Sequence, residues 1–151
     1  HIVVRRQRQM CIRDSPFLNS AHDRALILGN GGAAAAVRFG LQSLGIDVVH
    51  VTRSPIEWEA MRYDTLNAAY LRHCKLVVQC TPVGTYPNTE ARIDLPWDGL
   101  TPEHLAVDLV YNPAQTAFLK RAEAAGAKTM NGKAMLIAQA EAAWEWWNAT
   151  T

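Results

Sequence analysis

The sequence predicts an α/β fold, in which helices cover both faces of a doubly wound, mostly parallel sheet of about five or six strands. Two observations support this fold class. Short apolar segments rich in β-branched residues alternate with longer segments of helical period, as in strand–helix–strand units. A glycine-rich turn at residues 29–32 joins the first such unit, and an alanine-rich segment follows it directly.

The first unit begins with a predicted strand at residues 25–28. A helix is expected over residues 32–44, because its apolar residues recur at intervals of three and four, and Gly45 suits the left-handed position after a helix. Residues 47–51 are rich in β-branched side chains and are predicted to form the second strand.

The remaining elements follow from the same periods. Residues 58–73 are predicted to form one or two short helices, and residues 75–80 and 105–110 two further strands. The proline-containing residues 85–104 are interpreted as a surface loop with a short helical turn.

We expect Asn112 to cap the next helix, with Pro113 at its first position and Gly126 after its end. Three of its residues should be buried, namely Phe118, Leu119 and Ala122. A short strand at residues 127–130 and a last helix at residues 132–148 complete the fold. The main apolar stripe predicted for this helix consists of Leu136, Ala140, Ala143, Trp144 and Trp147.

The composition favours one globular domain without a strongly charged surface. Of the 151 residues, 49% are hydrophobic and 19% are charged, and a net charge of +1 argues against a nucleic-acid or membrane partner. Cys11, Cys74 and Cys80 form no CxxC pair, which indicates a reducing, cytoplasmic setting. The histidines lack metal-ligand spacing, so we expect no metal site. The sequence carries no signal for an oligomeric state.

The first residues differ from the rest of the chain. Residues 1–15 carry four arginines without a clear period, and their apolar start is too short for a secretion signal. We interpret them as a disordered or extraneous leader; the alternative, a basic arm that binds nucleic acid, rests on the arginines alone. Residues 16–24 are interpreted as a linker and residues 25–151 as the globular domain.

The glycine-rich turn is the first candidate site. Gly29, Gly31 and Ala34 fit the G-x-G-x-x-G/A spacing, in which the first glycine makes the turn and the second admits a pyrophosphate. A plain tight turn is the alternative. Because a strand precedes the turn and a helix follows it, the context favours a dinucleotide.

The end of the second strand bears on which dinucleotide is bound. Folds that bind NAD usually place an acidic residue here for the ribose 2′-hydroxyl, whereas this chain has Thr52, Arg53 and Ser54. A guanidinium pairs well with a 2′-phosphate, so the sequence favours NADP over NAD. The alternative is a solvated loop arginine.

Beyond these patterns, the chain from Ala25 onward resembles the C-terminal, NADP-binding domain of the shikimate dehydrogenase family, a Rossmann-like domain. Five segments carry the resemblance, in the family's order: residues 29–33, 52–54, 80–84, 108–116 and 131–140. The last two are far more specific than the glycine turn. Gln139 illustrates what the resemblance adds, because its spacing from Gly132 and Met135 alone favours a solvated amide.

The resemblance implies reversible, NADPH-dependent reduction of 3-dehydroshikimate to shikimate, a step of aromatic amino acid biosynthesis. It implies that substrate contacts are made by Tyr111 and Gln139. It implies that NADP is bound by Gly29, Asn30, Gly31, Gly32, Ala33, Thr52, Arg53, Ser54, Thr81, Val83, Leu109, Gly132 and Met135.

The chain departs from the family in three ways. Thr52–Arg53–Ser54 replaces the usual Asn-Arg-Thr, and Gln79–Cys80 stands where a motif usually begins with Asn. The family's N-terminal substrate domain, with its proton-transferring lysine and aspartate, has no counterpart in these residues. We therefore expect no catalytic residue here, and little activity from this chain without that domain. A non-catalytic NADP(H)-binding module and a related quinate/shikimate dehydrogenase are the alternatives.

Overall fold

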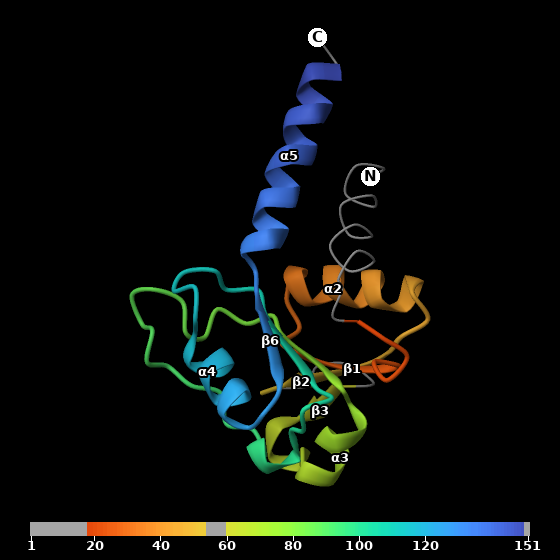
Figure 1. Cartoon of the computed structure of the whole chain (residues 1–151), viewed down its shortest axis with the longest axis vertical. Coiled ribbons are helices and arrows are strands. Elements are labelled where there is room, and N and C mark those ends of the chain that lie inside the picture. The colour runs from red at the N-terminus through yellow and green to blue at the C-terminus, as the bar shows by residue number, and fades with distance from the viewer. Residues whose placement is uncertain (1–17, 54–59, 150–151) are drawn as a thin grey trace.

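The computed structural model describes residues 18–53 and 60–149, which form a six-stranded sheet with helices on both faces (Figure 1). The strands are all parallel and lie in the order β3-β2-β1-β4-β5-β6. Their bounds are β1 Arg24–Leu28, β2 Asp47–Thr52, β3 Ala60–Arg62, β4 Leu76–Gln79, β5 Leu105–Asp108 and β6 Lys128–Asn131. The order runs outward in both directions from β1 and β4, as in doubly wound folds.

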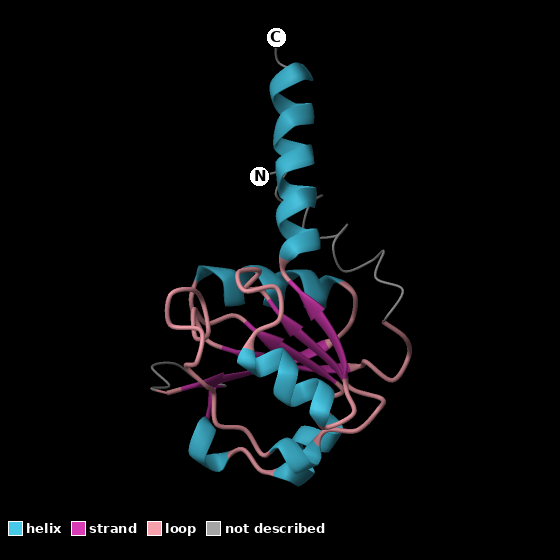
Figure 2. Cartoon of the chain, turned by 60° about the vertical axis from the view of Figure 1, so that its left-hand side comes forward, coloured by secondary structure: helices cyan, strands magenta, loops and turns pink. Residues whose placement is uncertain are grey.

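The helices lie on opposite faces of this sheet (Figure 2). One face is covered by α2, which contacts β1 and β2, whereas α4 contacts β5 and β6 on the other face. A short helix, α3, lies on the same side as α4. The bounds are α2 Gly32–Ser43, α3 Ala68–His73, α4 Ala117–Ala124 and α5 Lys133–Ala149, with short 3₁₀ turns at Tyr63–Thr65 (η1) and Trp97–Gly99 (η2).

The core lies on both faces because β1 is buried on both. Ala25 and Ile27 pack against the α2 side with Leu41, while Leu26 and Leu28 pack against the α3 and α4 side. Leu71 and Phe118 belong to this second cluster. Alternation along one strand thus supplies two cores, and continuous apolar character is typical of such a central parallel strand.

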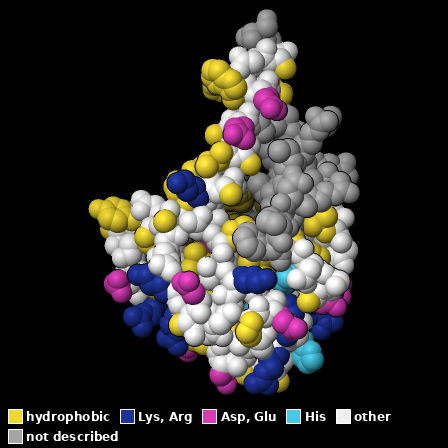
Figure 3. Space-filling view, viewed as in Figure 1, with side chains coloured by type: hydrophobic (Ala, Val, Ile, Leu, Met, Phe, Trp, Pro, Cys, Tyr) yellow, Lys and Arg dark blue, Asp and Glu magenta, His cyan; other side chains and the backbone are white. Residues whose placement is uncertain are grey.

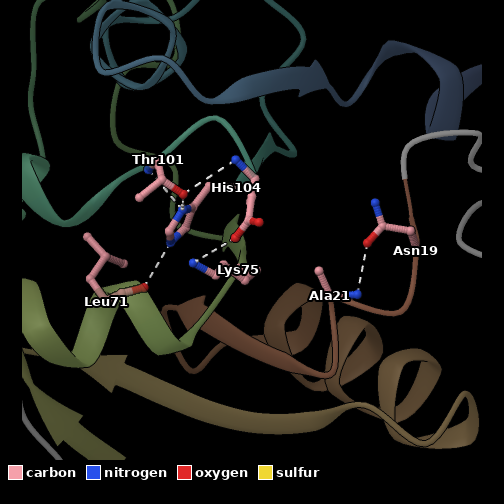
Figure 4. Close-up of polar contacts among 7 residues, drawn as sticks. Asn19, Ala21, Leu71, Lys75, Thr101 and His104 are labelled. Carbon is pink, nitrogen blue, oxygen red and sulfur yellow. Dashed lines mark hydrogen bonds and ion pairs between the residues drawn. The ribbon is translucent and has the colours of Figure 1, made fainter.

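The edge of the sheet at the amino ends of β4 and β5 is held by a buried histidine (Figure 4). Nδ1 of His104 accepts a hydrogen bond from the Thr101 backbone N–H at 2.9 Å, and Nε2 lies 2.9 Å from the Leu71 carbonyl oxygen. Burial lowers the pKa of His104, so the neutral imidazole suits this position. Lys75 and Glu103 form an ion pair at 3.3 Å beside it. This histidine is a core residue that ties α3 to the start of β5.

Most predicted elements are confirmed within a residue or two, but one strand was not predicted and one cap was wrong. The short helices expected within residues 58–73 are α3 and the turn η1, whereas the strand β3 before them was not predicted; residues 58 and 59 lie outside the described residues. Asn112 does not cap a helix, because α4 begins only at Ala117 and its cap is Thr116. The Thr116 hydroxyl accepts from the Leu119 N–H at 3.3 Å, which satisfies an N–H of the first turn.

Two further segments differ in burial from the sequence expectation. The expected surface loop holds for residues 85–88, which are exposed, and the expected helical turn is η2. Ile93, Leu95 and Leu100, by contrast, are buried in the second core, so the later part of this segment packs against the sheet. The stripe predicted for the last helix lies on an exposed helix: Leu136 is 40% exposed and Trp144 is 68% exposed. α5 extends away from the sheet, and apolar side chains follow its length (Figure 3). No helix in the described ranges is long and apolar enough to cross a membrane.

Candidate functional site

The predicted site residues gather at one edge of the sheet. Because all strands are parallel, their carboxyl ends meet there, and ligands of open α/β sheets bind at this edge. We use the term carboxyl edge for the last residues of β1, β2, β4, β5 and β6, the loops that follow them, and the first turns of α2 and α5. The carboxyl edge includes all the predicted cofactor residues that the structure describes.

The glycine turn after β1 has a tight part and an open part. Gly29 has φ +114°, and its N–H donates to the Val51 carbonyl at 2.9 Å. A methyl group on Gly29 would lie 3.1 Å from Thr81 Cγ2, a tight contact, and the positive φ would strain any side chain there. By contrast, methyl groups on Gly31 and Gly32 would meet no atom of the described residues within 4 Å. The open space lies on the side where the chain enters α2.

The first turn of α2 suits an anion. The helix begins at Gly32. Its cap residue is Gly31, so no side chain of the cap residue occupies the N–H groups of the first turn. The first turn contains no acidic residue, and Asn30 and Ala33 are exposed. Backbone N–H groups at the start of a helix lack partners within the helix and sit at its positive end, where phosphate groups bind.

The end of β2 presents a cation beside a buried hydroxyl. Thr52 is 4% exposed, and its Oγ1 forms no hydrogen bond with the described residues. Arg53 follows and is exposed. Burial raises the pKa of the Tyr63 phenol, while the positive charge of nearby Arg53 opposes this shift. Ser54, the third predicted residue of this group, lies outside the described residues.

The loop after β4 is shaped by a buried glutamine. Oε1 of Gln79 accepts from the Thr81 N–H at 2.6 Å and from the Thr81 hydroxyl at 2.7 Å. Nε2 of Gln79 donates to the Val83 carbonyl at 3.0 Å. Both predicted cofactor residues of this loop are therefore hydrogen-bonded to one side chain, which the sequence analysis did not select as a site residue.

The loop after β5 is shaped by a buried carboxylate. Oδ1 of Asp108 accepts from the Val110 N–H at 2.9 Å, and Oδ2 accepts from the Thr116 hydroxyl at 2.6 Å. Asp108 thus holds both ends of the segment that carries Tyr111. Burial raises the pKa of Asp108 to about 6, although both hydrogen bonds favour the ionised form.

The two loops are joined to each other. The Tyr86 N–H donates to the Asn112 carbonyl at 3.1 Å. Gly84, with φ +87°, lies next to Thr116: a methyl group on Gly84 would be in ordinary contact with Thr116 Cβ, at 3.9 Å. A displacement of one loop therefore acts on the other.

The segment that leads into α5 packs on the loop after β5 by a contact between the backbones of Gly132 and Leu109. A methyl group on Gly132 would overlap the Leu109 carbonyl oxygen and lie 2.7 Å from the Leu109 carbonyl carbon. Met135 is half-buried one turn later, and Tyr111 is 50% exposed. Gln139 lies in α5, and its side chain is outside the described parts of the chain.

Neither described cysteine is a nucleophile at neutral pH. Burial raises the pKa of Cys80 to about 12, with a further rise from Asp108, and burial raises the pKa of Cys74 to about 11. Within the described ranges, no three His, Cys, Asp or Glu side chains form a group able to hold a metal ion.

Comparison with known proteins extends the resemblance. The chain is 38% identical over 144 residues to a protein of Desulforamulus reducens named shikimate dehydrogenase (NADP(+)), a match that covers 84% of this chain. The chain is a relative of the shikimate dehydrogenases. A protein of the same name from Symbiobacterium thermophilum is 37% identical over 142 residues, or 82% of the chain. The chain spans about half the length of these relatives, 50% and 48% respectively. No protein-family model matches.

The fold agrees with this relationship. The shikimate 5-dehydrogenase of Thermus thermophilus, solved in complex with NADP(H) and shikimate, superposes with a TM-score of 0.75 at 30% identity. The alignment covers 97% of this chain and 56% of that one. A chorismate mutase/shikimate 5-dehydrogenase fusion protein from Clostridium acetobutylicum has a TM-score of 0.68 at 37% identity, over 83% of this chain and 46% of that one. The Rossmann-like fold is thereby confirmed.

The contact between Gly132 and Leu109 can be tested with Gly132→Ala. The added methyl group must displace the β5 loop or the start of α5, so we expect the free energy of unfolding to fall by about 1–3 kcal/mol. Chemical denaturation measures this change. Gly32→Ala is the matched control, since among residues 18–53 and 60–149 a methyl group there meets no atom within 4 Å. Equal stabilities of the two variants would contradict the close-contact assignment.

The buried Asp108 predicts a pH dependence of stability. A carboxyl group whose pKa rises on folding, here from 3.8 to about 6, stabilises the fold fully only below its unfolded pKa, and this contribution is lost as the pH rises to about 6. We expect the wild type to lose about 2 kcal/mol relative to Asp108→Asn between pH 4 and 6, out of about 3 kcal/mol in all, and the difference to become level about one pH unit above the folded pKa. Urea denaturation at each pH measures it. Parallel curves for the two proteins would contradict the raised pKa.

Proposed function

We propose that this chain provides the NADP(H)-binding half of a shikimate dehydrogenase, which reversibly reduces 3-dehydroshikimate to shikimate. The observation that carries the proposal is the end of β2, where exposed Arg53 and buried Thr52 stand in place of the carboxylate usual for NAD. The relatives named above, and the NADP(H) complex of the Thermus enzyme, support the same cofactor.

The described residues fit such a cofactor. In this proposal, N–H groups at the start of α2 bind the pyrophosphate in the open space beside Gly31 and Gly32, and Arg53 pairs with the 2′-phosphate. When bound, NADPH supplies the hydride. Leu109 is fixed against Gly132 and, with Met135, borders the side of the carboxyl edge remote from Arg53. These residues orient the cofactor, and the chemistry of proton transfer is assigned to the other half.

The substrate side follows the same proposal. Tyr111 and Gln139 contact the polar groups of shikimate, and Asp108 fixes the loop that carries Tyr111. The parent enzyme acts in the cytoplasm on the route to aromatic amino acids; free Cys74 and Cys80 suit that reducing compartment.

Titration of the 151-residue chain with NADPH and NADH tests the cofactor. Arg53→Ala is expected to weaken NADPH binding by about 10- to 100-fold, because a hydrogen bond to a charged group contributes about 1.5–3 kcal/mol. NADH binding should change little. Arg24→Ala, an exposed arginine at the opposite end of β1, is the control. Equal losses for both cofactors would contradict the role of Arg53.

A second assay tests the reaction. The chain is mixed with the separately produced N-terminal half of the Desulforamulus relative, and NADPH oxidation is followed with 3-dehydroshikimate or 3-dehydroquinate. We expect turnover of 3-dehydroshikimate by the mixture and little by the chain alone. Ordinary turnover by the chain alone would contradict the expected need for a second half. Preference of the mixture for 3-dehydroquinate would favour the quinate/shikimate dehydrogenase. Binding of NADPH without turnover of either substrate would favour the non-catalytic module.

A further inference from the structure

Gln79 is a buried polar residue that holds one loop of the site. It is the last residue of β4, is fully buried, and pairs in register with Asp108 of β5. All the hydrogen bonds described for its amide go to Thr81 and Val83, residues of the loop that follows. The Thr81 hydroxyl also accepts from the Val83 N–H at 3.3 Å, which closes the network. The side chain therefore determines the conformation of that loop.

The loop held by Gln79 contacts both neighbouring parts of the carboxyl edge. On one side, Thr81 lies close to Gly29 of the glycine turn: a methyl group on Gly29 would be 3.1 Å from Thr81 Cγ2. On the other side, the Tyr86 N–H bonds to the Asn112 carbonyl in the loop after β5. The spacing between the glycine turn and the β5 loop thus depends on the loop between them.

The two nucleosides of a dinucleotide bound at this edge would lie on opposite sides of the glycine turn. In a doubly wound sheet the pyrophosphate lies at the turn after the first strand and the adenosine ribose lies toward the second. The other nucleoside then lies toward the loops after β4 and β5. Arg53, Gly31 and Gly32 belong to the adenosine side, and Gln79 to the other side.

We propose that Gln79 is a positioning residue for the nicotinamide half of the cofactor. It holds residues 80–84 in the shape that receives this half, and being buried it acts through Thr81 and Val83. This inference rests on the proposed function. Loss of the amide would leave the Thr81 N–H and the Val83 carbonyl without their partner, so the loop would rearrange to satisfy them. The adenosine side would keep its contacts.

Comparison of two ligands tests this role. NADPH carries both halves of the cofactor, whereas adenosine 2′,5′-bisphosphate carries only the adenosine half. Gln79→Met keeps the size and neutrality of the side chain but removes the amide. We expect it to weaken NADPH binding roughly tenfold, the effect of one lost buried hydrogen bond. Its affinity for the bisphosphate should stay within about twofold of wild type, because the contacts proposed for this ligand are with Arg53 and the start of α2 and not with residues 80–84. Calorimetric titration measures both affinities.

The bisphosphate also reports whether each variant is folded. If Gln79→Met does not fold, Thr81→Val replaces it, because this change removes the hydroxyl from a half-buried loop residue and leaves Gln79 in place. Gln115→Ala is the matched control: it removes an exposed amide bonded to Glu123, and should change neither affinity.

Three outcomes overturn the inference. An unchanged affinity for NADPH, or equal losses for both ligands, would show that Gln79 does not act on the nicotinamide half. In either case the wild type still binds both ligands, and the proposed function stands. If the wild type binds neither ligand, the proposed function fails and the assignment of Gln79 fails with it.

Discussion

The parallel pairing of β1 with both β2 and β4 is the constraint on which the rest of the structure depends. Because the chain runs outward in both directions from this pair, successive loops emerge at one edge and on either side of Gly29. The buried apolar faces of β1 stabilise the pairing from both layers of helices. A turn, a cation and two polar loops that are distant in the sequence are thereby brought together.

Buried polar side chains then determine the shape of that edge. Gln79 and Asp108 are the last residues of adjacent strands and pair in register. The side chain of each forms hydrogen bonds with residues of the loop that follows its strand. Burying an amide or a carboxylate is unfavourable unless its hydrogen bonds are satisfied, and for Asp108 the raised pKa measures part of that cost. The same requirement makes these side chains specific, because few loop conformations satisfy all their bonds.

The sequence predicted what depends on periodicity and on the glycine turn. The strand at residues 25–28 and the helix from Gly32 were predictable, because burial on one or both faces leaves a regular pattern. The edge strand β3 was not, since three residues are too few to show a period. Asn112 was mistaken for a cap because Asn followed by Pro suits a helix start, whereas Thr116 is selected by its bond to Asp108. Gln79 was not selected as a site residue, because its hydrogen-bond partners are brought to it only by folding. The presence of a polar residue at the end of each of two buried strands could have indicated it.

The hydrogen bond from Tyr86 to Asn112 has a thermodynamic consequence. It connects the loop that follows β4 to the loop that follows β5, so a displacement of one loop alone would break this bond. A ligand that orders one loop therefore lowers the entropic cost of ordering the other, and the coupling is reciprocal. Two ligands that each order one of these loops would then each raise the affinity for the other, through the backbone bond between Tyr86 and Asn112.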